Sequence, residues 1–139
     1  VLDADAIFDF NFKHSNILLT PHKGEMKRLT ASSKPEDLLE YASKNGVTLL
    51  VKGEVDIITD GNLMKENRSG HPRMTVGGTG DVLAGVCGAF VAKGLTPFES
   101  ARLAAYSLGK AGENCYEEIG AGFLPTDLTL SLSKVLRRN

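Results

Sequence analysis

The feature that most constrains this chain is the turn Gly77-Gly78-Thr79-Gly80-Asp81, which runs directly into the apolar stretch 82–90. A glycine-rich turn at a helix start exposes several backbone N–H groups, and the positive end of the helix adds to their attraction for anions. The pattern predicts an anion site with phosphate as the preferred ligand; the competing interpretation is a tight turn that only lets a helix pack closely. Because a carboxylate and a phosphate repel each other, we expect Asp81 to act as a base toward a hydroxyl that is about to meet the phosphate.

Composition and charge narrow the class of protein. The 139 residues suffice for one compact domain, and a formal net charge of -1 gives no general attraction to nucleic acid or to anionic membranes. Cys87 and Cys115 form neither a CxxC pair nor a metal-ligand cluster, which favours a reducing compartment without a structural disulfide. The longest apolar run, 82–92, is too short to cross a bilayer, so we expect a cytoplasmic protein.

The first residues already carry the pattern of a protein interior. Val1-Leu2-Asp3-Ala4-Asp5 reads as a buried strand that ends in carboxylates, without a lead-in segment. We therefore expect residues 1–139 to be the C-terminal portion of a single domain, whose N-terminal portion lies outside this chain.

The order of the expected elements indicates an α/β protein. Short apolar runs at 1–2, 17–20 and 47–51 are typical of buried parallel strands, and the stretches 55–59 and 63–66 around Asp60-Gly61-Asn62 predict a β-hairpin. Helices are expected over residues 34–45, 79–93, 96–117 and 125–138, the first and third behind the capping boxes Ser33–Glu36 and Thr96–Glu99. The helix over 79–93 is apolar almost all round, so we expect it to be buried.

Four polar residues at predicted strand ends have two interpretations each. His22 contacts a ligand or caps the following turn, and Lys52 neutralises phosphate or is simply solvated. Asp3 and Asp5 hold Mg²⁺ through water or cap the next turn. The P-loop and Rossmann glycine patterns are absent, so a nucleotide would be bound in another way.

Several motifs together resemble the ADP/ATP-dependent NAD(P)H-hydrate dehydratases, a family with a ribokinase-like fold. In chain order they are VLDAD at 1–5, LTPHKGE at 19–25, VKG at 51–53, NRSGHPRM at 67–74, GGTGDVLAG at 77–85 and GFLPTDL at 122–128. The resemblance implies the C-terminal part of a three-layer α/β/α fold with a mostly parallel sheet.

The resemblance also implies a metabolite-repair lyase. Such enzymes use ADP or ATP, with Mg²⁺, to phosphorylate the hydroxyl of the S form of hydrated NADH or NADPH, and loss of phosphate then restores the ring double bond. The implied substrates are NADH hydrate and NADPH hydrate, and the implied assembly is a homo-oligomer.

Residue roles carried over from the family fall on three groups. Asp81 would be the catalytic base beside the substrate hydroxyl, and His22 would contact the nicotinamide hydrate. The nucleotide and its phosphates would be bound by Lys52, Gly53, Glu54, Val55, Asp56, Asn67, Gly78, Thr79 and Gly80.

The chain also departs from the family pattern. His71 and Arg73 stand where members often have Asn and Gly around the loop proline, and both are still expected to face the phosphates. Leu108 replaces a histidine common before Gly109, so any role of that histidine in packing the adenine would be lost. Because the family domain has roughly as much chain again before Val1, we expect residues 1–139 alone to be inactive and poorly soluble.

Two other functions remain open at the level of sequence. A small-molecule kinase of the same fold, acting on a vitamin precursor or a sugar, would keep Asp81 and the anion site but release a phosphorylated product. A nucleotide-binding module without activity would gain nothing from a carboxylate that faces phosphate.

Overall fold

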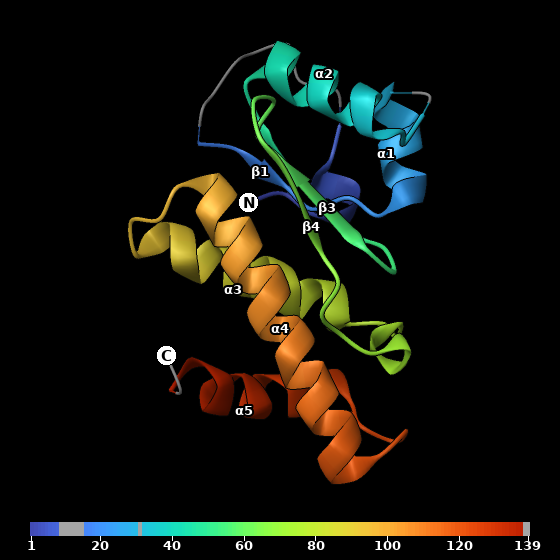
Figure 1. Cartoon of the computed structure of the whole chain (residues 1–139), viewed down its shortest axis with the longest axis vertical. Helices are drawn as coiled ribbons and strands as arrows, with labels where there is room; N and C mark the ends of the chain where they lie inside the picture. The colour runs from blue at the N-terminus through green and yellow to red at the C-terminus, as the bar shows by residue number, and fades with distance from the viewer. Residues whose placement is uncertain (9–15, 31, 138–139) are drawn as a thin grey trace.

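The computed structural model describes residues 1–8, 16–30 and 32–137, and there it forms a sheet with helices on both faces (Figure 1). The strands are β1 (Leu18–Leu19), β2 (Thr48–Val51), β3 (Asp56–Thr59) and β4 (Met64–Asn67). The α-helices are α1 (Lys23–Thr30), α2 (Pro35–Asn45), α3 (Thr79–Ala92), α4 (Pro97–Ile119) and α5 (Pro125–Leu136). Short 3-10 turns cover η1 (Ala4–Ala6) and η2 (Pro72–Met74).

The sheet has the order β1-β2-β3-β4. β1 and β2 are parallel, and Leu2 extends the parallel part through a bridge to Leu19. β3 pairs antiparallel with both β2 and β4, which confirms the predicted hairpin. Within the described residues the sheet is therefore mixed, and the expectation of a mostly parallel sheet is wrong for this part of the chain. The short connections 52–55 and 60–63 are the physical reason, because a connection this short can only reverse the strand direction.

Alternating strand residues divide the interior into two layers. Leu18, Leu50 and Ile58 pack with residues of α3, α4 and α5 in one cluster. Leu19, Leu49 and Val51 point to the opposite face and pack under α1 and α2. Successive side chains of a strand alternate between the faces of the sheet, and full burial of one such side chain stabilises the fold by about 1.5–3 kcal/mol. The expected α/β/α layering is confirmed (Figure 1).

The helix starts show which local signals were sufficient. At α4 the Thr96 hydroxyl accepts a bond from the Glu99 N–H at 3.2 Å, and the Glu99 carboxylate accepts one from the Thr96 N–H at 3.0 Å, as predicted. The box Ser33–Glu36 does not form, because α2 begins at Pro35 with Lys34 as its N-cap and no side-chain cap bond. Ser33 therefore lies one residue outside the cap.

Helix α1 was not expected from the sequence. Its start is closed by a reciprocal pair of bonds: the Glu25 N–H donates to Nδ1 of His22 at 3.0 Å, and the His22 N–H donates to the Glu25 carboxylate at 2.8 Å. This arrangement is a capping box with an imidazole in the place of the usual hydroxyl. The spacing His22-x-x-Glu25 was the available signal.

Helix α3 is less buried than its composition suggested. Only Leu83 and Cys87 are buried, while Gly85 and Ala89 are exposed. Among the described elements α3 packs against α4 and α5, and its other side carries no cover from them. The expectation of a helix buried all round is wrong for the described residues, because an apolar composition favours burial but does not determine whether another element packs against each side of the helix.

No described helix combines the length and apolar character needed to span a membrane.

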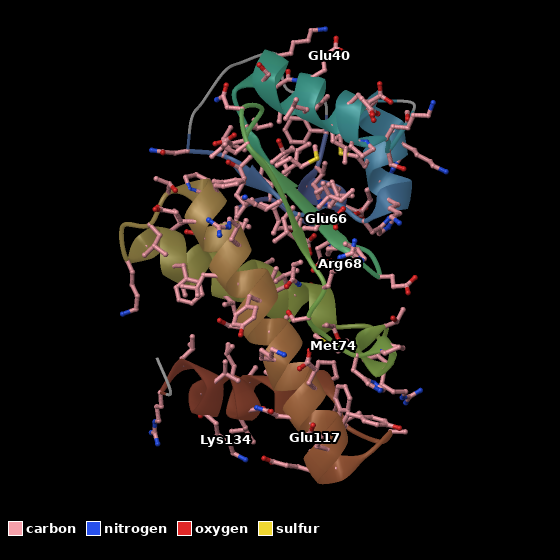
Figure 2. The ribbon with its side chains drawn as sticks, in the orientation of Figure 1. Glu40, Glu66, Arg68, Met74, Glu117 and Lys134 are labelled. Carbon is pink, nitrogen blue, oxygen red and sulfur yellow. The ribbon has the colours of Figure 1, made fainter. Side chains whose placement is uncertain are left out.

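Two glycines of α4 let the loop after β4 approach the helix closely. A Cβ on Gly109 would lie 2.7 Å from the carbonyl carbon and oxygen of Ser69, and one on Gly112 would lie 2.8 Å from Cγ of Met74. Figure 2 shows Met74 beside α4 at this contact. The loop that leads into α3 is thus seated on α4 through these two positions.

We predict opposite effects for two Gly→Ala substitutions in helices. Gly109→Ala should lower the free energy of unfolding by about 1–3 kcal/mol, because the new methyl group meets Ser69 backbone atoms that cannot rotate away. Gly88→Ala in α3 is the control: a Cβ there meets nothing within 4 Å among the described residues. It should stabilise the helix by up to about 1 kcal/mol. Urea unfolding of both variants checks the sign, and stabilisation by Gly109→Ala would contradict the close approach.

We also predict that both cysteines are unreactive in the folded protein. Cys87 and Cys115 are free and buried, and burial raises the pKa of Cys87 to about 12 and the pKa of Cys115 above its ordinary value. The thiolate is the reactive form, so at pH 8 almost all of Cys87 is in the unreactive thiol form. A disulfide reagent should label both thiols after denaturation and neither before. Leu130→Cys, at a position 70% exposed, is the positive control; rapid native labelling of Cys87 would contradict the packing.

Candidate functional site

The parallel part of the sheet gathers polar residues at one edge. Asp3 follows the bridge-forming Leu2, and Thr20 and His22 follow β1. Lys52 follows β2, pairs with His22 in an isolated parallel bridge, and donates its N–H to the Pro21 carbonyl at 2.8 Å. The carboxyl ends of parallel strands meet at a common edge, which is where open α/β sheets bind ligands. The structure thus brings together residues from three separate stretches of sequence.

Asp3, Thr20 and Lys52 form one connected group at this edge. The Lys52 ammonium lies 2.6 Å from Oδ1 of Asp3, and the Thr20 hydroxyl donates to the same oxygen at 2.9 Å. The side chains of Lys52 and Asp3 are 22% and 16% exposed, and Thr20 is fully buried. A pair this well covered is screened by solvent less than a surface ion pair.

The N-terminus of α3 meets this group at Gly80. A Cβ on Gly80 would lie 3.3 Å from Nζ of Lys52 and 3.7 Å from Oδ2 of Asp3. Gly78 is the N-cap with φ +96°, a left-handed conformation that favours glycine, and it lies against Pro125 at the start of α5. The Thr79 N–H donates to the Val76 carbonyl at 3.3 Å. The other N–H groups in the first turn of a helix generally have no acceptor within the helix. The predicted anion site therefore has a rigid helix start with an ammonium beside it.

Two further groups complete the helix start. Asp81 lies in the first turn of α3 and is exposed, so its carboxylate is open to a reactant. The Thr79 hydroxyl is buried and has no hydrogen-bond partner among the described residues. A buried hydroxyl without a partner is costly, and an anion or a water molecule at this end of the helix would satisfy it.

The predicted nucleotide segment Lys52–Asp56 is the turn between β2 and β3. Asp56 closes it, because the Gly53 N–H donates to Oδ1 of Asp56 at 3.0 Å. Asn67 donates its amide to Oδ2 of the same carboxylate at 3.0 Å, and its amide oxygen accepts the Ser69 hydroxyl at 2.7 Å. Asn67 is therefore a buried support of the turn, whereas Gly53 and Glu54 are exposed and Val55 is half-buried.

The observed contacts of His22 are those of a helix cap, because it bonds to Glu25 at the start of α1. Besides accepting from the Glu25 N–H, its ring places Nε2 3.3 Å from a carboxylate oxygen of Glu25, and its side chain is 58% exposed. Gly24 leaves room for this ring, since a Cβ there would lie 2.8 Å from Cε1 of His22. The cap fixes the imidazole at the edge of the site, and contact with a substrate stays a prediction.

The three residues that depart from the family pattern have structural partners. His71 stacks on Tyr116 with ring centroids 3.7 Å apart, and Nε of Arg73 donates to the Ala121 carbonyl at 2.8 Å. Both side chains are thereby held at the C-terminal end of α4, and the expectation that they face the phosphates remains a prediction. Leu108 is 2% exposed and belongs to the core between α4 and the sheet.

Asp3 and Asp5 do not converge on a common site. Asp3 is engaged by Lys52 and Thr20, while Asp5 is exposed within η1. Across residues 1–8, 16–30 and 32–137 no three His, Cys, Asp or Glu side chains come close enough to hold a metal ion. Metal binding by these two aspartates stays a prediction.

Sequence reasoning missed two members of the site. Thr20 orients the Asp3 carboxylate, and Lys23 lies over the turn, with its Cε 3.1 Å from the Cβ position of Gly53. The available signal was the end of the buried strand β1, which Thr20 follows directly and Lys23 follows at the start of α1, because the carboxyl end of such a strand marks the ligand-binding edge of a sheet.

We predict a pH-dependent cost for Asn67→Ala. Burial raises the pKa of Asp56 above its ordinary value, against opposing hydrogen bonds from Asn67 and the Gly53 N–H. With a raised folded pKa, stability is greatest below the unfolded value of 3.8 and is lost as pH rises through the folded pKa. Without the Asn67 amide the folded pKa rises further. The variant should lose about 1–2 kcal/mol of unfolding free energy at neutral pH and clearly less near about pH 4.

Urea unfolding at both pH values measures this difference. Asn62→Ala is the control, because Asn62 is exposed in the hairpin turn. Equal losses for Asn67→Ala at the two pH values would show that the amide does not act through Asp56.

Comparison with known proteins gives the same picture over nearly the whole chain. The profile of the NAD(P)H-hydrate dehydratase family matches residues 1–134. The ADP-dependent (S)-NAD(P)H-hydrate dehydratase of Cenarchaeum symbiosum (strain A) is 44% identical over 129 residues, covering 88% of this chain and 45% of that protein. The chain spans less than half the length of the curated relatives it matches.

Solved structures agree on the fold. An ADP/ATP-dependent NAD(P)H-hydrate dehydratase from Bacillus subtilis, co-crystallised with ATP/Mg²⁺, matches with a TM-score of 0.89 at 26% identity, covering 99% of this chain and 53% of that one. A ribokinase-like superfamily protein from Enterococcus faecalis V583 matches with a TM-score of 0.85 at 25% identity, covering 99% and 51%. The ribokinase-like fold is thus confirmed, and with a family profile that matches residues 1–134, the chain belongs to the NAD(P)H-hydrate dehydratase family.

Proposed function

We propose that the protein carrying this chain is an ADP- or ATP-dependent (S)-NAD(P)H-hydrate dehydratase, and that residues 1–139 supply its phosphate-handling edge. The observation that carries the proposal is the meeting of the α3 N-terminus with the Lys52 ammonium at Gly80. The N–H groups that a helix start leaves without intrahelical partners, the helix dipole and a fixed cation together favour a phosphoryl group.

The phosphate end of the nucleotide fits this helix start. In this proposal the phosphate lies at the backbone N–H groups of Gly78 and Gly80, while the Thr79 N–H is already bonded to the Val76 carbonyl and the unpartnered Thr79 hydroxyl is the additional donor. The exposed turn formed by Gly53 and Glu54 borders the same edge and is available to the rest of the nucleotide. Mg²⁺ would enter with the nucleotide phosphates, as it commonly does in proteins that bind nucleotides.

The reaction needs a base and a good leaving group. Asp81 takes the proton of the hydrate hydroxyl. The hydroxyl oxygen then forms a bond to the terminal phosphorus of the nucleotide, and the bond between that phosphorus and the rest of the nucleotide breaks. Phosphate then leaves with the C–O bonding electrons as the lone pair of the ring nitrogen replaces them at carbon. Loss of a proton from the neighbouring carbon restores the ring double bond, so one nucleotide phosphate is released per hydrate repaired. Positioning and charge neutralisation account for most catalysis of this kind.

The remaining assignments belong to the same proposal. His22, exposed at the edge of the site and held by its cap, would contact the nicotinamide hydrate. The preference between NADH hydrate and NADPH hydrate would be set by parts of the complete protein that contact the nucleotide half of the substrate. A homo-oligomer in the cytoplasm is the expected setting, and the complete protein is the species to assay, since residues 1–139 span less than half of the curated relatives.

The proposed activity is tested by restoration of the dihydronicotinamide absorbance. The complete protein is mixed with ADP or ATP, Mg²⁺ and the S form of NADH hydrate, and released phosphate is measured in parallel. We expect one phosphate per NADH recovered. Asp81→Asn should lower kcat by about 10²–10⁴ while nucleotide binding is kept, because general base catalysis is worth about that much.

Asp37→Asn on α2 is the matched control and should leave kcat unchanged. Phosphorylation of another alcohol without recovery of NADH would favour a kinase of the same fold. Nucleotide binding without any turnover would favour a binding module, and full turnover by Asp81→Asn would remove Asp81 from the mechanism.

A further inference from the structure

We propose that Asp3 is a positioning residue for the phosphoryl transfer: its carboxylate holds the Lys52 ammonium against the N-terminus of α3 at Gly80. This inference rests on the proposed function and deepens it, since it assigns a role to a carboxylate that belongs to no catalytic step described above. Asp3 acts through Lys52 and is not itself a catalytic residue.

Backbone pairing fixes the place of the Asp3 carboxylate. The Leu2 N–H donates to the Leu18 carbonyl at 2.8 Å, and the Thr20 N–H donates to the Leu2 carbonyl at 3.0 Å. Asp3 follows directly after these bonds, so the residue is anchored to β1. The buried Thr20 hydroxyl then orients the side chain by donating to Oδ1 at 2.9 Å.

The start of a helix is an unfavourable position for an ammonium group unless another group attracts it there. The positive end of the helix dipole repels a cation, and a lysine side chain has many rotamers to escape into. Lys52 nevertheless lies there, 3.3 Å from the Cβ position of Gly80. Its 2.6 Å contact with Oδ1 of Asp3 supplies the opposing attraction.

The ion pair between Lys52 and Asp3 also removes a repulsion that would act on a phosphate. A bare carboxylate beside the helix start would repel an incoming phosphate, but Asp3 is neutralised by Lys52 before the nucleotide arrives. The ammonium keeps further N–H donors, since an NH₃⁺ group has three, and these are available to a phosphate oxygen. Gly80 makes the arrangement possible, because a larger residue would take the space of Nζ.

A double-mutant cycle in the complete protein tests this role. Asp3→Asn should lower kcat/KM for the nucleotide by about 10–100-fold, the range seen when residues that orient an active group are changed. Lys52→Met should cost at least as much. In the Lys52→Met background Asp3→Asn should cause less than about a threefold further loss, because there is no ammonium left to position. Asp37→Asn is the matched control and should match the wild type.

A second variant covers the case in which Asp3→Asn does not fold. Thr20→Val keeps both charges of the pair and the size of the buried side chain, and removes the hydroxyl that orients Asp3 together with its longer contact, at 3.3 Å, to the Leu2 carbonyl. It should lower kcat/KM for the nucleotide by about 3–10-fold while circular dichroism and the melting temperature stay close to those of the wild type.

The outcomes separate this inference from the proposed function. Absence of turnover in the wild-type protein overturns the proposed function and this role with it. Wild-type kinetics in Asp3→Asn and Thr20→Val, with Asp81→Asn inactive, overturn only the role of Asp3. Fully multiplicative losses in the double variant, or recovery of Asp3→Asn by added Mg²⁺, also overturn it, because they indicate a role independent of Lys52 or a metal ligand.

Discussion

The parallel pairing of Leu2, β1 and β2 is the interaction on which the rest of the site depends. It places Asp3, Thr20 and Lys52 at one edge of the sheet, although they come from distant stretches of the chain. The same pairing buries alternate side chains on opposite faces, which seats α1 and α2 on one side and α3 and α4 on the other (Figure 1). Packing and site geometry therefore share a single cause.

Electrostatic balance at the start of α3 follows from this frame. The helix dipole attracts anions, the Lys52 ammonium strengthens that attraction, and Asp3 keeps the ammonium in place. The charge of Lys52 and the charge of Asp3 would each be unfavourable alone, because a cation at a helix N-terminus is repelled and a covered carboxylate needs a partner. Together they form a neutral pair in front of a positive helix end. Such a preorganised arrangement pays little reorganisation when charge develops during phosphoryl transfer.

Several expectations drawn from local patterns were wrong for physical reasons that the structure identifies. The Ser33 capping box does not form because α2 begins one residue later than that signal requires, at Pro35. Helix α3 is only partly covered among the described residues, where its main contacts with other helices are with α4 and α5 and its buried residues are Leu83 and Cys87. Helix α1 was overlooked because its cap uses His22, a residue outside the usual set of hydroxyl and carboxylate caps.

The sequence by itself determined the features that depend on near neighbours in the chain: the hairpin at Asp60-Gly61-Asn62, the Thr96 capping box, and the glycine-rich start of α3 with Asp81 in its first turn. These are fixed by backbone geometry and hydrogen bonds within a few residues. Only the tertiary structure decided that Asn67 supports Asp56 and that Gly109 receives Ser69. The tertiary structure alone also placed the Lys52 ammonium beside Gly80, where it forms an ion pair with Asp3. Strand pairing decides which side chains meet across long separations in the chain, and the spacing of residues in the sequence does not encode that pairing.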